Sequence, residues 1–326
     1  MSILLGRRLA AMLPLLLLAV SSVDAAQRTF VSTAGNDASA TCSLSLPCRG
    51  FTKAISVTDP GGEIVVLDSG GYGAVTINQA VTIEAPPGVY AGISVFGGAG
   101  VTVNPASGKV TLRGLTINAL GGTTGILYQS GDALYVDNVV VSGFSGGGGV
   151  GLSVVGGPTP SALFIQDSTF RDNATGLSAG SLTGLKLRVE RTIFERNGIG
   201  ADLRASTSGT IHDSAFSNGT TGVSAGGGVA LELRDCTLSD NSGVGVSALG
   251  ASPATILAVV SSLISGNATG IQATNSGNTV YSSDNTITRN ATGISATASA
   301  TIISGSDNRL IGNGANGSFT STTPKI

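Results

Sequence analysis

The sequence predicts an all-β solenoid, a parallel β-helix of about 10–11 coils. Two observations carry this prediction. After residue 60, short apolar runs alternate with turn residues, and from residue 163 onward one phrase returns at a short interval. The phrase reads DSTFRDNATG, RTIFERNGIG, DSAFSNGTTG, DCTLSDNSGVG, SSLISGNATG and DNTITRNATG, with DNRLIGN as a degenerate last copy. A repeat this short means that each unit packs only against its neighbours.

The interval between repeats sets the size of one coil. Aligned on the first residue of the phrase, successive coils start 22 to 29 residues apart. The starts are Gly114, Asn138, Asp167, Arg191, Asp213, Asp235, Ser261, Asp284 and Asp307. At about 3.3 Å per residue, a coil of this length is roughly 75 Å of chain, enough for three short strands and three turns. The two longest intervals predict loops at Ser145–Gly149 and Leu249–Pro253.

The elements of each coil are expected to be strands of about four to five residues. Within each run apolar and polar residues alternate, β-branched residues are frequent, and Gly or Asn stands at the breaks. The runs that precede the clear repeats are EIVVL, AVTI, AVTIEA, GISVF, VTV, KVTLRGLTI, GILY and ALYVDNVVVS. No amphipathic helix separates them, which excludes a βαβ fold.

Columns of stacked side chains explain why these residues recur. Alternate side chains of a strand lie on one face, so apolar residues two positions apart are expected to point inward. The aliphatic positions are Leu163, Ile165, Leu187, Val189, Ile211, Leu231, Leu233, Leu257 and Val259. The next inward column is Phe170, Phe194, Phe216, Leu238, Ile264, Ile287 and Leu310. Stacked coil upon coil, these columns would form a continuous apolar core.

The turn after the phenylalanine column predicts an asparagine ladder. Asparagine tolerates the left-handed backbone conformation, and its amide would pair with the amides above and below. The ladder residues are Asn173, Asn197, Asn241, Asn267, Asn290 and Asn313. Three of them begin glycosylation sequons, but burial in a ladder explains the pattern more simply. The glycines that follow are expected to supply the next bend: Gly176, Gly200, Gly222, Gly245, Gly270 and Gly293.

The N-terminus predicts export. Residues 1–25 combine Arg7 and Arg8, an apolar core around Leu15–Val20, and small residues before Ala25, which is typical of a secretory signal peptide cleaved after Ala25. The apolar run is too short for a membrane span. The mature protein is therefore expected to be extracellular or periplasmic, without membrane insertion.

The next segment, residues 26–60, is expected to cap the solenoid, because an uncovered first coil would expose its interior and a strand edge. It should contain a short helix and a loop closed by a Cys42–Cys48 disulfide, which an exported protein can form. Residues 61–317 are assigned to the β-helix and 318–326 to a C-terminal tail. Cys236 has no partner and is expected to be a small buried thiol.

The opening segment carries a resemblance. Its phrases TFVSTAGND and PCRGFTKAI resemble the start of many secreted right-handed parallel β-helix proteins. The coils after it resemble the pectate-lyase-like superfamily over nearly the whole mature chain. This resemblance, with the right-handed crossover rule, implies a right-handed solenoid. The usual activities of the superfamily are cleavage or epimerisation of acidic polysaccharides, but fold alone is a weak argument for any of them.

Composition and motifs restrict the function. The net charge is −2, and removal of the signal peptide leaves 15 basic and 18 acidic residues, which argues against nucleic acid as a partner. The Asp-Asp and Gly-His-Gly motifs of polygalacturonase-like hydrolases are absent, as are the clustered carboxylates of calcium-dependent lyases and the Asp-Pro-His-Asp motif of mannuronan epimerases. We therefore expect no metal and no cofactor, and a monomer.

One group of charges remains as a candidate site. In register, Glu190, His212 and Arg234 share one outward position on three successive coils. The weak catalytic candidates are Glu190, His212, Asp213, Arg234 and Asp235, and the weak substrate-binding candidates are Arg188, Arg191 and Glu232. Stacked about 4.8 Å apart, they have the chemistry for proton transfer and for holding an acidic sugar. Pairing of opposite charges on a solvated face explains them more simply. Lys186 is a further, weaker candidate for a lyase base.

Carbohydrate binding without catalysis would favour exposed aromatic side chains. Trp is absent, and the tyrosines lie on distant coils: Tyr72, Tyr90, Tyr128, Tyr135 and Tyr281. The leading hypothesis is an exported, non-catalytic or catalytically degenerate protein that contacts polysaccharide or another extracellular surface. The alternative is a polysaccharide lyase or glycoside hydrolase that acts on an acidic glycan with a site near His212.

Overall fold

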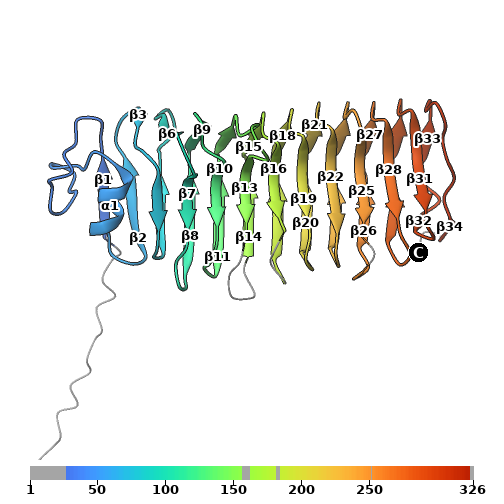
Figure 1. Ribbon diagram of the computed structural model, residues 1–326, viewed down its shortest axis with the longest axis horizontal. Helices are drawn as coiled ribbons and strands as arrows, with labels where there is room; N and C mark the ends of the chain where they lie inside the picture. The colour runs from blue at the N-terminus through green and yellow to red at the C-terminus, as the bar shows by residue number, and fades with distance from the viewer. Residues whose placement is uncertain (1–26, 156–161, 181–183, 251, 324–326) are drawn as a thin grey trace, which may run out of the picture.

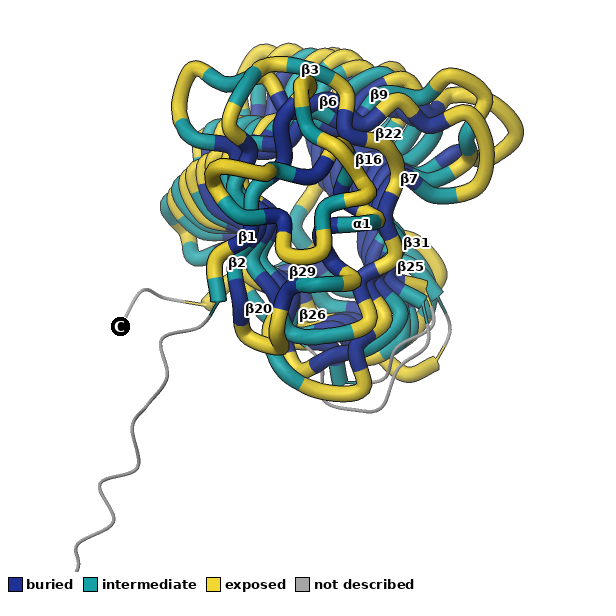
Figure 2. Tube along the Cα trace, turned by 90° about the vertical axis from the view of Figure 1, so that its left-hand side faces the viewer, coloured by how far each residue is buried: buried dark blue, intermediate teal, exposed yellow. Residues whose placement is uncertain are grey.

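The computed structural model describes residues 27–155, 162–180, 184–250 and 252–323. The expected signal peptide lies outside the described residues. The chain winds into about ten turns of a solenoid whose strands run side by side along its length (Figure 1), and all pairs of strands are parallel. The predicted all-β parallel solenoid is thus confirmed. Viewed along the axis, buried residues line the inside of the coils and exposed residues lie mainly on turns and outer faces (Figure 2).

Three parallel sheets form the walls. The first sheet has 13 strands: β1 (Arg28–Val31), β2 (Gly62–Val66), β5 (Val81–Glu84), β8 (Lys109–Arg113), β11 (Ala133–Asp137), β14 (Ala162–Gln166), β17 (Lys186–Glu190), β20 (Ser208–His212), β23 (Ala230–Arg234), β26 (Ile256–Val260), β29 (Thr279–Ser283), β32 (Thr301–Ser304) and β34 (Ser321–Thr322). The last of these, β34, lies within residues 318–326, so the sheet continues into the segment expected as a tail.

The second sheet has 11 strands: β3 (Gly70–Gly71), β6 (Ala91–Val95), β9 (Leu115–Ala119), β12 (Val140–Ser142), β15 (Thr169–Arg171), β18 (Ile193–Glu195), β21 (Ala215–Ser217), β24 (Thr237–Ser239), β27 (Leu263–Ser265), β30 (Thr286–Thr288) and β33 (Arg309–Ile311). The third sheet has 10 strands: β4 (Val75–Ile77), β7 (Ala99–Val103), β10 (Thr124–Tyr128), β13 (Val150–Val154), β16 (Thr175–Ala179), β19 (Ile199–Leu203), β22 (Thr221–Gly226), β25 (Val244–Leu249), β28 (Thr269–Thr274) and β31 (Thr292–Thr297).

The first residue of the repeated phrase forms the corner between the first and second sheets. It has a positive φ in nearly every coil, for example 50° at Asp167, 44° at Arg191 and 50° at Asp213. A single left-handed residue turns the chain sharply, and Asp and Asn adopt this conformation at low cost. The corner therefore explains why acidic and amide residues predominate at the start of the phrase.

The core columns lie where the sequence predicts. The aliphatic positions of the first sheet are buried, and so is the next column apart from Leu310, which is partly buried at the C-terminal end. The ring centroids of Phe170 and Phe194 lie 5.2 Å apart, and those of Phe194 and Phe216 lie 4.7 Å apart with nearly parallel planes. Stacking of identical residues thus fills the interior without a wide core.

The asparagine ladder is present, with one gap. The Nδ2 of Asn267 donates to Oδ1 of Asn290 at 3.0 Å, and equivalent bonds join Asn173 to Asn197, Asn241 to Asn267 and Asn290 to Asn313. Gly219 occupies the ladder position between Asn197 and Asn241, so no side chain continues the row there. The sequon residues Asn173, Asn267 and Asn290 are each only 2% exposed.

Two backbone predictions in this region are wrong. The left-handed residue is the one before each ladder asparagine, such as Asp172 (φ 58°) or Arg289 (φ 56°), and the ladder asparagines themselves have no positive φ. The following glycines make no bend. They lie inside strands of the third sheet, where a Cβ on Gly176 would lie 2.6 Å from the carbonyl oxygen of Gly200 and 2.9 Å from the ring of Phe194. Glycine is needed there for close packing of coils.

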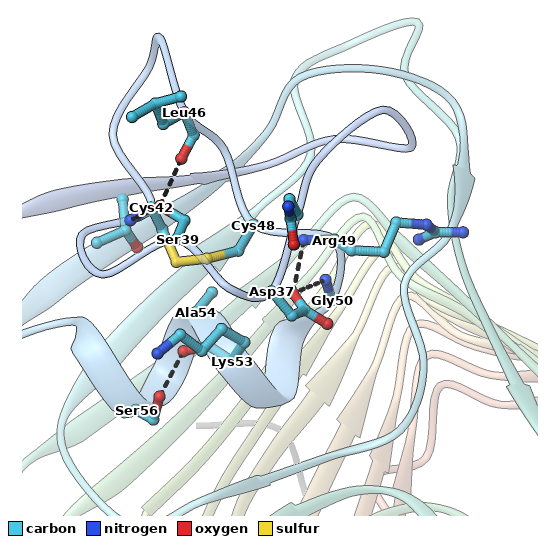
Figure 3. Close-up of a disulfide and its surroundings, with 12 residues drawn as sticks. Asp37, Ser39, Cys42, Leu46, Cys48, Arg49, Gly50, Lys53, Ala54 and Ser56 are labelled. Carbon is cyan, nitrogen blue, oxygen red and sulfur yellow. Dashed lines mark hydrogen bonds between the residues drawn. A yellow bond between two sulfur atoms is a disulfide. The ribbon is translucent and has the colours of Figure 1, made fainter.

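The N-terminal cap contains the expected disulfide and helix (Figure 3). Cys42 and Cys48 are bonded, with their Cα atoms 4.9 Å apart, and the helix α1 (Phe51–Val57) lies beside them. The carboxylate of Asp37 accepts hydrogen bonds from the backbone N–H groups of Arg49 (2.7 Å) and Gly50 (3.1 Å), which ties the loop to the start of the helix. Phe51 and Ala54 are buried, and the helix contacts β1, β2 and β4.

Two further observations concern the rest of the chain. Cys236 is 2% exposed and free, as predicted, and burial raises the pKa of its thiol to about 11. Within the part of the chain that the structure describes, no helix is long and apolar enough to cross a membrane.

Candidate functional site

The outer face of the first sheet carries the charged residues selected from the sequence. Side chains alternate along each strand, so three positions of every five-residue strand face outward. We define the central column as the middle outward position, which comprises Thr82, Thr111, Tyr135, Phe164, Arg188, Thr210, Glu232, Ala258 and Tyr281. We define the corner column as the last outward position, which comprises Glu84, Arg113, Asp137, Gln166, Glu190, His212, Arg234, Val260 and Ser283.

Two aromatic side chains stack in the central column. Tyr135 and Phe164 are register partners on neighbouring strands, and their ring centroids lie 4.6 Å apart with an angle of 6° between planes. Because the rings are parallel at roughly the spacing of the strands, each turns one face toward the other and one face away along the axis. The face of Tyr135 that points away is directed toward Thr111, and that of Phe164 is directed toward Arg188.

The sequence analysis identifies only one member of this pair. Tyr135 is one of the five candidate tyrosines, whereas Phe164 is not among the candidates. Counting back three residues from the coil starts Asn138 and Asp167 reaches both aromatic residues, so the repeat register contained the signal. Of the other tyrosines, Tyr72 and Tyr128 are buried, whereas Tyr90 and Tyr281 are exposed on separate coils.

Two hollows adjoin the aromatic pair. The first has a volume of about 200 Å³ and opens over the small side chain of Thr111. The second has a volume of about 210 Å³ and opens toward Arg188 and Glu190. The first is lined by Lys109, Thr111, Arg113, Tyr135, Val136, Asp137, Phe164 and Gln166, and the second by Tyr135, Phe164, Ile165, Gln166, Arg188 and Glu190. Both are smaller than the usual pocket for a drug-sized ligand, so each suits a single ring-sized unit.

The structure brings four of the charged candidates together around a fifth, Glu190, whose side chain is 12% exposed. Its carboxylate bonds to Arg188, to Nε2 of His212 at 2.7 Å and to Arg191 at 3.3 Å. The Nδ1 of His212 lies 3.1 Å from a carboxylate oxygen of Asp213. Each charge in this group is therefore paired with an opposite one.

The other candidates lie apart from this group. Arg234 pairs with Glu232 on its own strand at 2.6 Å, although it is the register partner of His212. Among the described residues Asp235 forms no ion pair. The Nζ of Lys186 donates to Ser208 at 3.0 Å, at the far end of the strands. Register places Lys186, Glu232 and Arg234 on one face, but side-chain pairing divides that face into local groups.

The electrostatics of the Glu190 group favour its charged forms. Hydrogen bonding to Glu190 is the main cause that raises the pKa of His212, with a further contribution from Asp213. Partial burial tends to raise the pKa of Glu190, but hydrogen bonds from His212 and Arg188 outweigh it and lower that pKa. Glu190 is therefore held as a carboxylate, and protonation of His212 is favoured.

Within the described ranges no group of three or more His, Cys, Asp or Glu side chains is placed to hold a metal ion.

Comparison with known proteins identifies the fold family. The family model described as "Right handed beta helix region" matches residues 99–258 and 165–325. The chain belongs to this right-handed β-helix family. The right-handed parallel β-helix expected from the sequence is thus confirmed. A search of curated proteins gave no significant match.

Solved structures resemble this β-helix at low sequence identity. A structure of XylC in complex with xylose has a TM-score of 0.58 and 9% identity over 83% of this chain and 70% of that one. The mannuronan C-5 epimerase AlgE4 A-module from Azotobacter vinelandii has a TM-score of 0.54 and 16% identity over 82% and 91%. A GH136 lacto-N-biosidase from Eubacterium ramulus has a TM-score of 0.50 and 11% identity over 91% and 67%. At these identities the likeness establishes the fold alone.

Proposed function

We propose that this β-helix is an exported protein that binds a carbohydrate chain, without catalysis, on the outer face of its first sheet. The stacked pair Tyr135 and Phe164, which lines one hollow with Thr111 and another with Arg188, is the observation that carries the proposal. Sugar rings present apolar C–H faces that pack on aromatic rings, while their hydroxyls need nearby polar groups. The charged and amide side chains that line the hollows meet that need.

Export and carbohydrate binding have independent support. The Cys42–Cys48 disulfide fits an oxidising compartment outside the cytoplasm, and the signal peptide expected at residues 1–25 would direct the protein there. The similar structures include, by their names, a complex with xylose, an epimerase of mannuronan and a lacto-N-biosidase. This β-helix therefore resembles proteins whose names refer to carbohydrate ligands or substrates. We propose that it binds carbohydrate as a monomer.

The proposal is tested with the purified chain that follows Ala25. Binding to a panel of soluble polysaccharides is measured by calorimetry, and the Tyr135→Ala/Phe164→Ala double variant is compared with Tyr281→Ala. Tyr281 lies in the same central column, is 46% exposed and has Ala258 as its partner, so it is a matched aromatic without a stack. We expect the double variant to lose about 10- to 100-fold in affinity and Tyr281→Ala to match the native protein. Equal effects of both changes would contradict the proposal.

A second candidate is a lyase or hydrolase near His212. It is favoured by one observation: Glu190 lines the second hollow and is hydrogen-bonded to His212. The electrostatics work against it, because a general acid needs a raised carboxyl pKa and a general base needs a histidine that loses its proton easily. Glu190 and His212 are shifted in the opposite senses. Release of new reducing or unsaturated ends from a bound glycan, abolished in His212→Ala, would establish the enzyme in place of the binding protein.

A further inference from the structure

The arginine at the first hollow is already engaged. Nε of Arg113 lies 2.8 Å from Asp137, and Nη1 lies 3.3 Å from Glu84. The hydrogen bond to Asp137 is the main cause that raises the pKa of Arg113. Lys109 also lines this hollow, and among the described residues it forms no ion pair. Its charge and that of Arg113 balance the carboxylates of Asp137 and Glu84, so the hollow offers little net positive charge to an anion from outside.

The second hollow has the same balance. Arg188 is bonded to Glu190, and that carboxylate also receives His212 and Arg191. Arg191 in turn forms a two-bond pair with Asp167, at 2.7 and 2.9 Å. An incoming carboxylate would have to displace Glu190 from Arg188 and would then lie beside that carboxylate, which is 12% exposed and which His212 and Arg191 hold in place. Breaking an ion pair of a partly buried carboxylate is unfavourable, and like charges in one hollow repel.

Between the two hollows lies a neutral polar group. Gln166 is the register partner of Asp137 on one side and Glu190 on the other, and it lines both hollows. Its exposed amide offers two donors and one acceptor, which suits sugar hydroxyls. A lysine or arginine at this position, between Asp137 and Glu190, would bind the carboxylate of an acidic ligand. The residue at this position is instead the uncharged Gln166.

We propose that the ligand of this face is an uncharged glycan, whose ring faces lie against Tyr135 and Phe164 and whose hydroxyls bond to Gln166 and to the paired charges. This inference rests on the proposed carbohydrate binding and names the class of sugar. Carboxylates held in ion pairs still accept hydrogen bonds from hydroxyls, so Asp137 and Glu190 contribute to a neutral ligand while they repel a uronate. Neutral hexose or pentose polymers fit this face and polyuronates do not.

The experiment compares neutral polymers (xylan, glucomannan, galactan) with polyuronates (polygalacturonate, alginate) by calorimetry at low and high salt. We expect one or more neutral polymers to bind with an affinity that salt changes less than about twofold, because no net charge is neutralised on binding. We expect polyuronates to bind at least about tenfold more weakly. The variant Gln166→Lys should gain polyuronate binding that salt weakens, and Gln166→Glu should not. Thermal unfolding of both variants establishes that the fold is retained.

The outcomes separate the two proposals. Salt-sensitive polyuronate binding by the native protein, tighter than any neutral polymer and lost in Tyr135→Ala/Phe164→Ala, would overturn the neutral-glycan inference and keep carbohydrate binding on this face. Neutral binding that survives loss of both aromatic side chains would overturn the proposed site. Binding of no polymer of either class would overturn the proposed function itself.

Discussion

Removal of one rung from the asparagine ladder, Asn267→Ala, should strongly destabilise the solenoid. The amide of Asn267 donates to Leu238 O at 2.9 Å and to Oδ1 of Asn290 at 3.0 Å, and its Oδ1 accepts from the backbone N–H of Asn241 at 3.1 Å and the side-chain amide of Asn241 at 2.9 Å. All of these bonds are buried. At about 1 kcal/mol each, and more where a buried donor stays unsatisfied, the loss is about 4 kcal/mol. That is a large fraction of the stability of an ordinary domain.

The matched control is Asn313→Ala at the end of the same row. Asn313 also accepts two bonds from Asn290, both at 3.0 Å, and donates to Ile287 O at 2.9 Å. It is partly exposed, so water can replace the lost partners, and we expect a cost of only about 1–2 kcal/mol. Urea unfolding followed by circular dichroism gives the free energy of unfolding of each variant. If Asn267→Ala cost no more than Asn313→Ala, burial would not be what gives the ladder its value.

Three further outcomes follow from the same geometry. Gly176→Ala should cost about 1–3 kcal/mol of unfolding free energy because its Cβ would meet Gly200 O at 2.6 Å, whereas Gly180→Ala, with open space around its Cβ, should be neutral in urea unfolding. Gly219→Asn, which would complete the ladder in the sequence, should lower the urea midpoint, because a Cβ there would lie 2.3 Å from Asn197 O; a stabilised variant would refute this. Glu190 and Asp213 raise the folded-state pKa of His212, and Arg188 and Arg234 also lie nearby. The contribution of His212 to stability is therefore complete below pH about 6.5 and is lost as the pH rises through the folded-state pKa. His212→Gln should remove that part of the pH dependence of stability, measured by thermal unfolding.

The fold could be predicted from the sequence because successive coils need the same kinds of residue at the same positions. Leu163, Phe170 and Asn173 recur in kind on most of the coils that follow, and only stacking at a fixed spacing uses such recurrence fully. The backbone behind the pattern was harder to infer. The glycine at position 176 and its equivalents suggested a bend, but the cause is the approach of Phe194 from the next coil, a contact between residues 18 apart that no local pattern reveals.

The candidate site could be predicted only in part. Register gave the alignment of Glu190, His212 and Arg234, since it follows from the repeat. Which charges pair depends on side-chain reach: Arg234 turns to Glu232 on its own strand and leaves His212 to Glu190. The aromatic pair spans the longest interval between coils, where residues 135 and 164 lie 29 positions apart, and an outward aromatic residue interrupts no apolar pattern.

The spacing that builds the ladder inside also governs what the outer face can bind. Register partners on neighbouring coils are close enough for opposite charges to neutralise each other, as Arg191 does with Asp167 and Arg196 with Asp172. Aromatic partners behave differently, because stacking Tyr135 on Phe164 satisfies one face of each ring and leaves the other face open. On a solenoid face, charged side chains are therefore neutralised by their neighbours more completely than aromatic rings are covered. We expect the exposed ring faces to make the main contacts with a ligand on this face.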